Sequence, residues 1–178
     1  MATKTAKSTK AETATKSDVA VAEPTVASVD TETASSVAQY LSPVVIDLEA
    51  LSINGKQAHW HVRGLNFIAV HELIDDVVDH AREFADLAAE RVVALGLPVD
   101  ARIETVAAKN TLPPMADGFQ QSNDVIATLV DSIDAALATV RKAVEGLDEI
   151  DPNSQDVATE IERGLTKDRW FLVAHIAA

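Results

Sequence analysis

The stretch AHWHVRGLNFIAVHELID, residues 58–75, decides how the chain folds. Apolar residues recur at helical spacing on both sides of Arg63-Gly64-Leu65-Asn66, and glycine is a residue at which helices commonly end. A connection this short makes two neighbouring helices run antiparallel. The stretch therefore predicts a pair of antiparallel helices joined at Gly64.

The rest of the chain predicts two more long helices after a long connection. Glycine and proline are scarce, at six each, which favours helix. Four long helices with one long crossover predict an all-α, ferritin-like four-helix bundle over residues 35–178. The expected helices start at 35–42 (where Ser42-Pro43 offers a cap) and end near 63, then cover about 67–95, 117–147 and 152–176 (with Asp151-Pro152 as cap), with a short helix near 101–108 in the crossover.

Residues 1–34 differ from the bundle in composition. They contain no Leu, Ile, Phe, Trp or Tyr, so we expect a disordered tail. Its first 17 residues carry a local charge of +3, from Glu12 and four lysines at Lys4, Lys7, Lys10 and Lys16, whereas the whole chain carries −13. The acidic body is unsuited to nucleic acid, and only the tail could bind DNA.

The sequence contains no cysteine and no apolar run long enough to span a membrane. The lysines of the N-terminus are followed by no apolar stretch, so no secretory signal is expected. These features exclude disulfides and thiolate metal sites, and they fit a cytoplasmic protein, which DNA binding by the tail would associate with the nucleoid.

The helix expected over 67–95 carries four residues of metal-ligand type on one face. His71 and Asp75 are four residues apart, as are Asp86 and Glu90, and all four fall within an arc of about 100°. One chain cannot gather them around an ion, because Asp75 and Asp86 lie about 16 Å apart along the helix.

The spacing is palindromic, which suggests a second copy. The pairs His71/Glu90 and Asp75/Asp86 are both centred on 80.5, so an antiparallel copy about a two-fold axis would bring each residue against its opposite number. Two equivalent sites would result, each shared between subunits. A solvated charged face is the plainer interpretation of either pair alone.

The helix before Gly64 adds His59, which can reach the His71 end of the next helix, and Trp60 beside it. Imidazole and carboxylate ligands without sulfur suit iron, manganese or zinc. Trp60 fits two roles equally, an electron donor beside the metal or a packing residue.

The run Lys56-Gln57-Ala58-His59-Trp60-His61-Val62-Arg63-Gly64-Leu65-Asn66-Phe67, with the continuations through Asp75 and from Asp86 to Arg91, resembles the signature of the Dps family, the DNA-binding proteins from starved cells. The resemblance implies a hollow dodecamer that oxidises Fe(II), preferably with hydrogen peroxide, at centres between subunits and stores the ferric product. It places iron ligands on five residues and the site tryptophan on Trp60; the ligands are His59, His71, Asp75, Asp86 and Glu90.

Three other functions are alternatives to this one. A ferroxidase centre inside each bundle needs Glu-x-x-His, and no histidine here has Glu three residues before it. A metal-dependent amide hydrolase stays open, because His71-Glu72-Leu73-Ile74-Asp75 resembles His-Glu-x-x-His with Asp in place of the second His. A metal-free DNA-compacting protein would not need the five ligand-type residues.

Acidic residues cluster where the third long helix ends and the fourth begins, at Asp148, Glu149, Asp151 and Asp156. If this corner met a three-fold axis, these carboxylates would ring a pore that attracts cations. An exposed acidic corner is the alternative.

Overall fold

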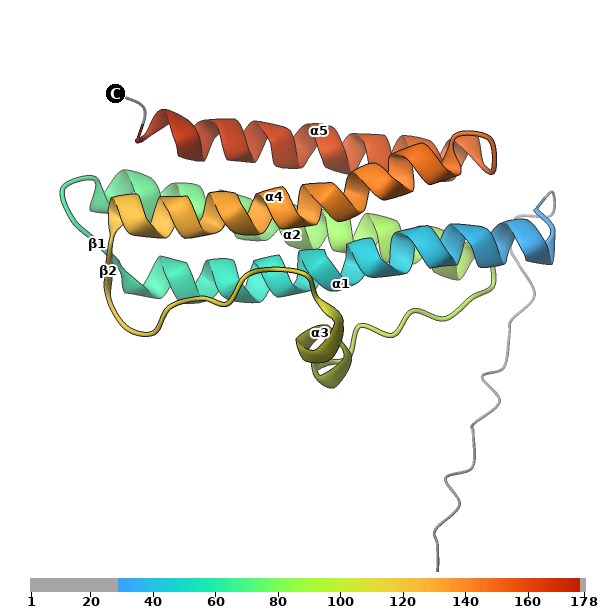
Figure 1. Cartoon of the computed structure of the whole chain (residues 1–178), viewed down its shortest axis with the longest axis horizontal. Coiled ribbons are helices and arrows are strands. Elements are labelled where there is room, and N and C mark those ends of the chain that lie inside the picture. The colour runs from blue at the N-terminus through green and yellow to red at the C-terminus, as the bar shows by residue number, and fades with distance from the viewer. Residues whose placement is uncertain (1–28, 177–178) are drawn as a thin grey trace, which may run out of the picture.

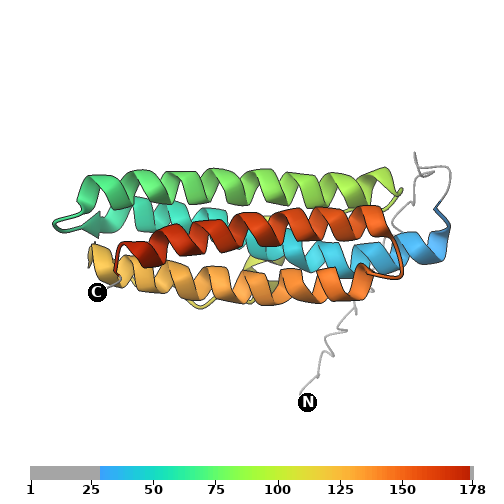
Figure 2. The same cartoon turned by 90° about the horizontal axis from the view of Figure 1, so that it is seen from above.

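The long helices lie side by side and form a bundle, as Figures 1 and 2 show from two directions. The computed structural model describes residues 29–176, so the four lysines of the expected tail lie outside the described part. The elements in chain order are α1 (Thr31–His61), β1 (Val62–Arg63), α2 (Phe67–Ala94), α3 (Ile103–Lys109), β2 (Gln120–Gln121), α4 (Ser122–Leu147) and α5 (Pro152–Ala174). The all-α prediction with a short helix in the α2–α4 crossover is confirmed.

The first helix begins earlier than expected, inside the segment 1–34 assigned to the tail. Asp30 caps α1 at Thr31 by accepting a hydrogen bond from the Thr33 amide, 2.8 Å away. Pro43 therefore lies inside the helix and not at its start, and the Ser42-Pro43 cap was wrong. The extra turns form because small apolar residues, Ala34 and Val37, bury their side chains against the core.

The α1–α2 connection is held to the start of α4 by a parallel pair of two-residue strands. Val62 is opposite Gln120 and Arg63 is opposite Gln121, so α4 begins at Ser122 and not near 117. Periodicity could not reveal this pairing, because it joins segments 58 residues apart. Gly64 has a φ of +124°, where a side chain would be strained, which explains a glycine at the turn.

The crossover between α2 and α4 runs back along the bundle, with α3 against α1 (Figure 1). The buried carboxylate of Asp47 in α1, which is 1% exposed, attaches the crossover to the bundle. It accepts hydrogen bonds from the Thr111 amide at 2.7 Å and from the Thr111 hydroxyl at 2.8 Å. Thr139 of α4 donates a third at 2.6 Å. No described helix is long and apolar enough to cross a membrane.

At the corner between α4 and α5 the expected Asp151-Pro152 cap is confirmed, and Asp151 proves to be a buried residue of an ion pair. Asp151 accepts a hydrogen bond from the Ser154 amide and Pro152 is the first helical residue. Asp151 is 7% exposed and paired with Arg91 of α2 at 2.5 Å, so it is a structural anchor and not a free pore carboxylate. The other pore candidates, Asp148, Glu149 and Asp156, are exposed.

Candidate metal centre

Two of the predicted ligands, His59 and His71, lie face to face where α1 and α2 adjoin. Their rings stack with centroids 3.6 Å apart. The Nδ1–H of His59 donates to the main-chain carbonyl of His71, and the Nδ1–H of His71 donates to that of His59, both at 3.0 Å. A carbonyl can only accept, so each Nδ1 carries the hydrogen and each Nε2 keeps a lone pair that can bind a metal.

Asp75 completes this cluster. Its carboxylate lies 3.1 Å from Nδ1 of His59 and forms an ion pair with Lys56 of α1. The hydrogen bond from Lys56 is the main reason why the pKa of Asp75 is lowered, and the two imidazoles also lower it. Asp75 is therefore a carboxylate at neutral pH, the form that binds metal ions.

The other two predicted ligands are not near this cluster within the chain. Asp86 and Glu90 are exposed on the same stripe of α2, and Glu90 is 19 positions from His71, about 28 Å along the helix. Among residues 29–176 no three His, Asp or Glu side chains are disposed to hold a metal. One chain therefore brings His59, His71 and Asp75 near one another, but not in an arrangement that holds an ion by itself. The other two predicted ligands are exposed on the same face of α2.

Two further side chains near this cluster, Lys56 and Trp60, bear on the predicted site. Lys56 was not singled out, although it could have been: the pairs His59/His71 and Lys56/Asp75 are centred at 65 and 65.5, so an antiparallel turn at Leu65 sets both pairs opposite each other. Trp60 is 62% exposed, which leaves its side chain available to a second subunit or to solvent.

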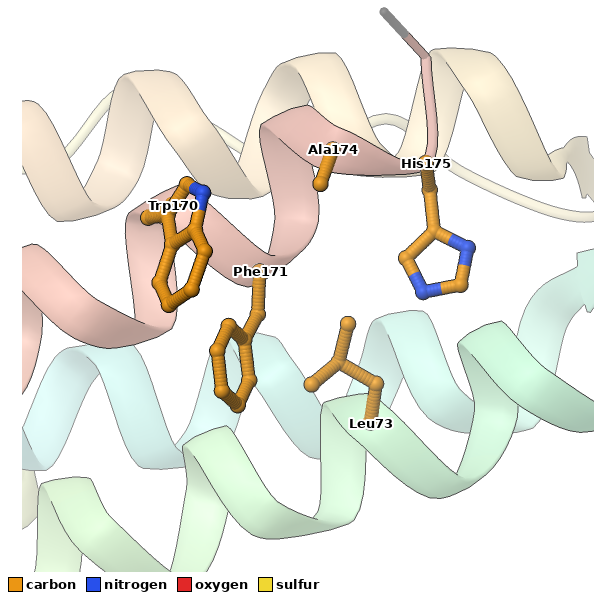
Figure 3. A pocket seen from close by; sticks show the side chains of 5 residues that line it. All are labelled: Leu73, Trp170, Phe171, Ala174 and His175. Atoms are coloured by element: carbon orange, nitrogen blue, oxygen red, sulfur yellow. The ribbon is translucent and has the colours of Figure 1, made fainter.

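An apolar pocket of about 390 Å³ lies near the C-terminal end of α5, and none of the predicted ligands lines it. Figure 3 shows the rings of Trp170 and Phe171 on α5, and of His175 just after it, beside Leu73 of α2. Trp170 is 64% exposed. The pocket is therefore separate from the candidate metal centre.

Comparisons with known proteins match both the fold and the stretch that carries the predicted ligands. A family model described as a ferritin-like domain matches residues 40–178. The "DNA protection during starvation protein" of Agrobacterium fabrum is 35% identical over 133 residues, which cover 74% of this chain and 80% of that protein.

Solved structures agree. Dps from Microbacterium arborescens, solved "in the high iron form", is 57% identical, has a TM-score of 0.81, and is matched over 84% of this chain and 98% of that one. Dps from Mycobacterium smegmatis is 30% identical, also with a TM-score of 0.81, over 85% and 93% of the two chains. With the ferritin-like bundle and the His59–His71–Asp75 cluster in place, the chain belongs to the Dps family of ferritin-like proteins.

Proposed function

We propose that this protein oxidises Fe(II) at centres shared between two antiparallel copies and stores the ferric product inside a homo-oligomeric cage, a dodecamer by the family resemblance. The observation that carries the proposal is the division of α2 into two complementary halves. One end offers His71 and Asp75 together with His59. The other offers Asp86 and Glu90, both exposed.

The exposed face of α2 supports the antiparallel pairing beyond the ligands. Ile68 and Val93, exposed at 60% and 57%, are also centred on 80.5, as are Asp79 and Arg82. Pairing two copies about that point would set apolar residues against each other at both ends and opposite charges near the middle. These positions and the ligands share one arc of about 100°.

The chain's own groups fit this chemistry. The imidazoles of His59 and His71 would offer Nε2, since Nδ1 is engaged, and the carboxylates of Asp75, Asp86 and Glu90 would offer oxygen, the donor set that suits iron. Two Fe(II) reduce one hydrogen peroxide, with two protons, to two waters and yield two Fe(III). The Asp75 carboxylate forms an ion pair with Lys56. If Asp75 binds iron, this ion pair must be weakened or broken.

Iron uptake has a candidate path at the α4–α5 corner. Asp148, Glu149 and Asp156 remain exposed there, and we propose that they attract cations if the corner surrounds a pore in the cage. Trp60 keeps both interpretations, an electron donor or a packing residue at the subunit interface.

The test of the proposed function is to load the metal-free protein with Fe(II) under anaerobic conditions and then add peroxide, following oxidation and particle size together. We expect oxidation of two Fe(II) per peroxide and an iron core within particles of unchanged outer size. Oxidation at the protein-free rate, or ferric precipitate outside the particles, would contradict the proposal.

DNA binding is a second candidate function, and only the tail supports it. The body, residues 35–178, has 15 − 4 = 11 Lys and Arg against 28 − 5 = 23 Asp and Glu, a charge of −12 that repels phosphate. Many basic tails on one cage could still gain avidity by about 10²–10⁴. At low salt we expect the full-length cage to retard DNA in a gel and a cage without residues 1–17 not to; equal mobility of DNA with both would exclude tail-dependent binding.

A further inference from the structure

A second histidine–carboxylate pair lies on the other side of α2. The Nδ1–H of His80 donates to both carboxylate oxygens of Asp168 on α5, at 2.9 and 3.1 Å. The Asp168 side chain is 3% exposed, whereas that of His80 is 38% exposed. The hydrogen bond fixes the tautomer, so Nε2 of His80 carries a lone pair and lies on the imidazole edge opposite Asp168.

Burying this carboxylate has an energetic cost. Desolvation raises the pKa of Asp168, and His80 and Lys167 only partly offset it. Asp76 raises it further, so the Asp76 carboxylate is near enough to be felt electrostatically. The imidazole of His80 is therefore the main group that compensates the burial of this carboxylate.

The pair faces away from the proposed subunit interface. His80 is nine residues from His71, about 180° around α2, so pairing of two copies along the ligand stripe leaves it accessible. Asp76 is exposed and four residues before His80, which puts both side chains on one face. Asp76 makes no ion pair in the described part of the chain.

We propose that His80, through Nε2, and Asp76, through its carboxylate, bind a divalent transition-metal ion whose remaining positions are filled by water, with Asp168 holding the imidazole in place. A carboxylate on the second nitrogen is the usual support of a metal-binding histidine, because it orients the ring and raises its basicity. One imidazole and one carboxylate suit Fe(II), Co(II), Mn(II) or Zn(II).

The surroundings keep the site small and its affinity modest. Phe84, four residues after His80, lies with its ring centroid 6.1 Å from the imidazole and packs on Gly164 of α5, which closes one side. Lys167 brings a positive charge toward Asp168 and opposes a cation there. Only two protein ligands are offered, which agrees with the absence of any three-ligand group among residues 29–176.

The test uses a background in which the proposed shared centre lacks two of its five ligands, the full-length His71→Ala/Glu90→Ala protein, with Co(II) as the probe in equilibrium dialysis. We expect one Co(II) per chain in this background, lost in His80→Gln and weakened by at least about 10-fold in Asp76→Asn. Asp168→Asn, a change to a positioning residue, should weaken binding by about 10–100-fold while leaving the stoichiometry unchanged. His175→Gln is the matched control and should bind as the background does.

His80→Gln leaves Asp168 buried without its partner and could therefore disturb folding. Asp76 is exposed, so Asp76→Asn should fold normally and tests the metal site without this complication. The proposal is overturned if the background binds no Co(II) at millimolar free metal, or if folded Asp76→Asn and His80→Gln proteins bind as the background does. The measurement involves no iron oxidation, so it can fail while the proposed function holds, and the reverse.

Discussion

Replacing either His71 or Glu90 with alanine is expected to slow peroxide-driven Fe(II) oxidation by about 100-fold or more, as loss of a direct ligand should exceed the 10–100-fold typical of outer-sphere changes. His71→Ala also deletes the hydrogen bond that its Nδ1–H donates to the His59 carbonyl. Equal losses at two residues about 28 Å apart on one helix are hard to explain by a site within one chain.

The control for this pair is His175→Ala, which removes an imidazole from the end of α5 that is outside the proposed centre. It should oxidise Fe(II) at the wild-type rate, measured from the absorbance of the ferric product at equal protein concentration. Near-normal oxidation in Glu90→Ala would show that Glu90 is not a ligand, whatever His71 does.

Asp151→Ala should lower the free energy of unfolding by about 3–5 kcal/mol, the typical cost of removing one partner from a buried ion pair. The Arg91 and Asp151 side chains are only 15% and 9% exposed, so little solvent screens the charge that Arg91 keeps. The substitution also removes the cap of α5 and the acceptor of the Ser154 amide. Asp148→Ala at the same corner alters an exposed residue bonded to Gln155, and should change stability by no more than about 0.5 kcal/mol.

The loss of stability caused by Asp151→Ala should become smaller as the pH falls. Burial by itself would raise the pKa of Asp151, but hydrogen bonds from Ser154 and Arg91 outweigh it and hold the pKa below its usual value. A lowered pKa contributes stability that is present above the unfolded value and is lost as the pH falls through the folded one. Urea unfolding followed by circular dichroism should therefore show a large difference between wild type and Asp151→Ala at pH 7 and a smaller one below about pH 4. A difference that does not shrink in acid would exclude the ion pair as its source.

The parts of the fold that could be predicted are those written locally in the sequence. Gly64 marks the turn and Asp151-Pro152 marks the start of α5, because a stop or cap needs only its own neighbours. The start of α1 and the β1–β2 pair escaped prediction, since both depend on segments that meet only after folding. Pro43 misled because a proline near a helix start and an exposed proline within a helix have the same local sequence.

The candidate site divides in the same way. The stripe on α2 follows from spacing alone, and His59 followed from the short turn. Lys56 was missed although the same turn places it opposite Asp75. His80 and Asp168 could not have been paired, because they are 88 residues apart on helices whose contact no local pattern encodes. Whether Asp86 and Glu90 of one copy meet His71 of another stays a prediction.

The sharing of each metal centre between two subunits is the central prediction, and one measurement tests it directly. His71→Ala and Glu90→Ala chains, each inactive alone and carrying different tags, are co-assembled in equal amounts. Mixed dimers are verified by cross-linking followed by tandem purification of the cross-linked dimers. In a mixed dimer one shared centre carries both substitutions and the other is intact. Random pairing makes half of the dimers mixed, so we expect about a quarter of the wild-type Fe(II) oxidation to return. Mixed dimers that form but oxidise Fe(II) no faster than either parent would contradict a centre shared between subunits.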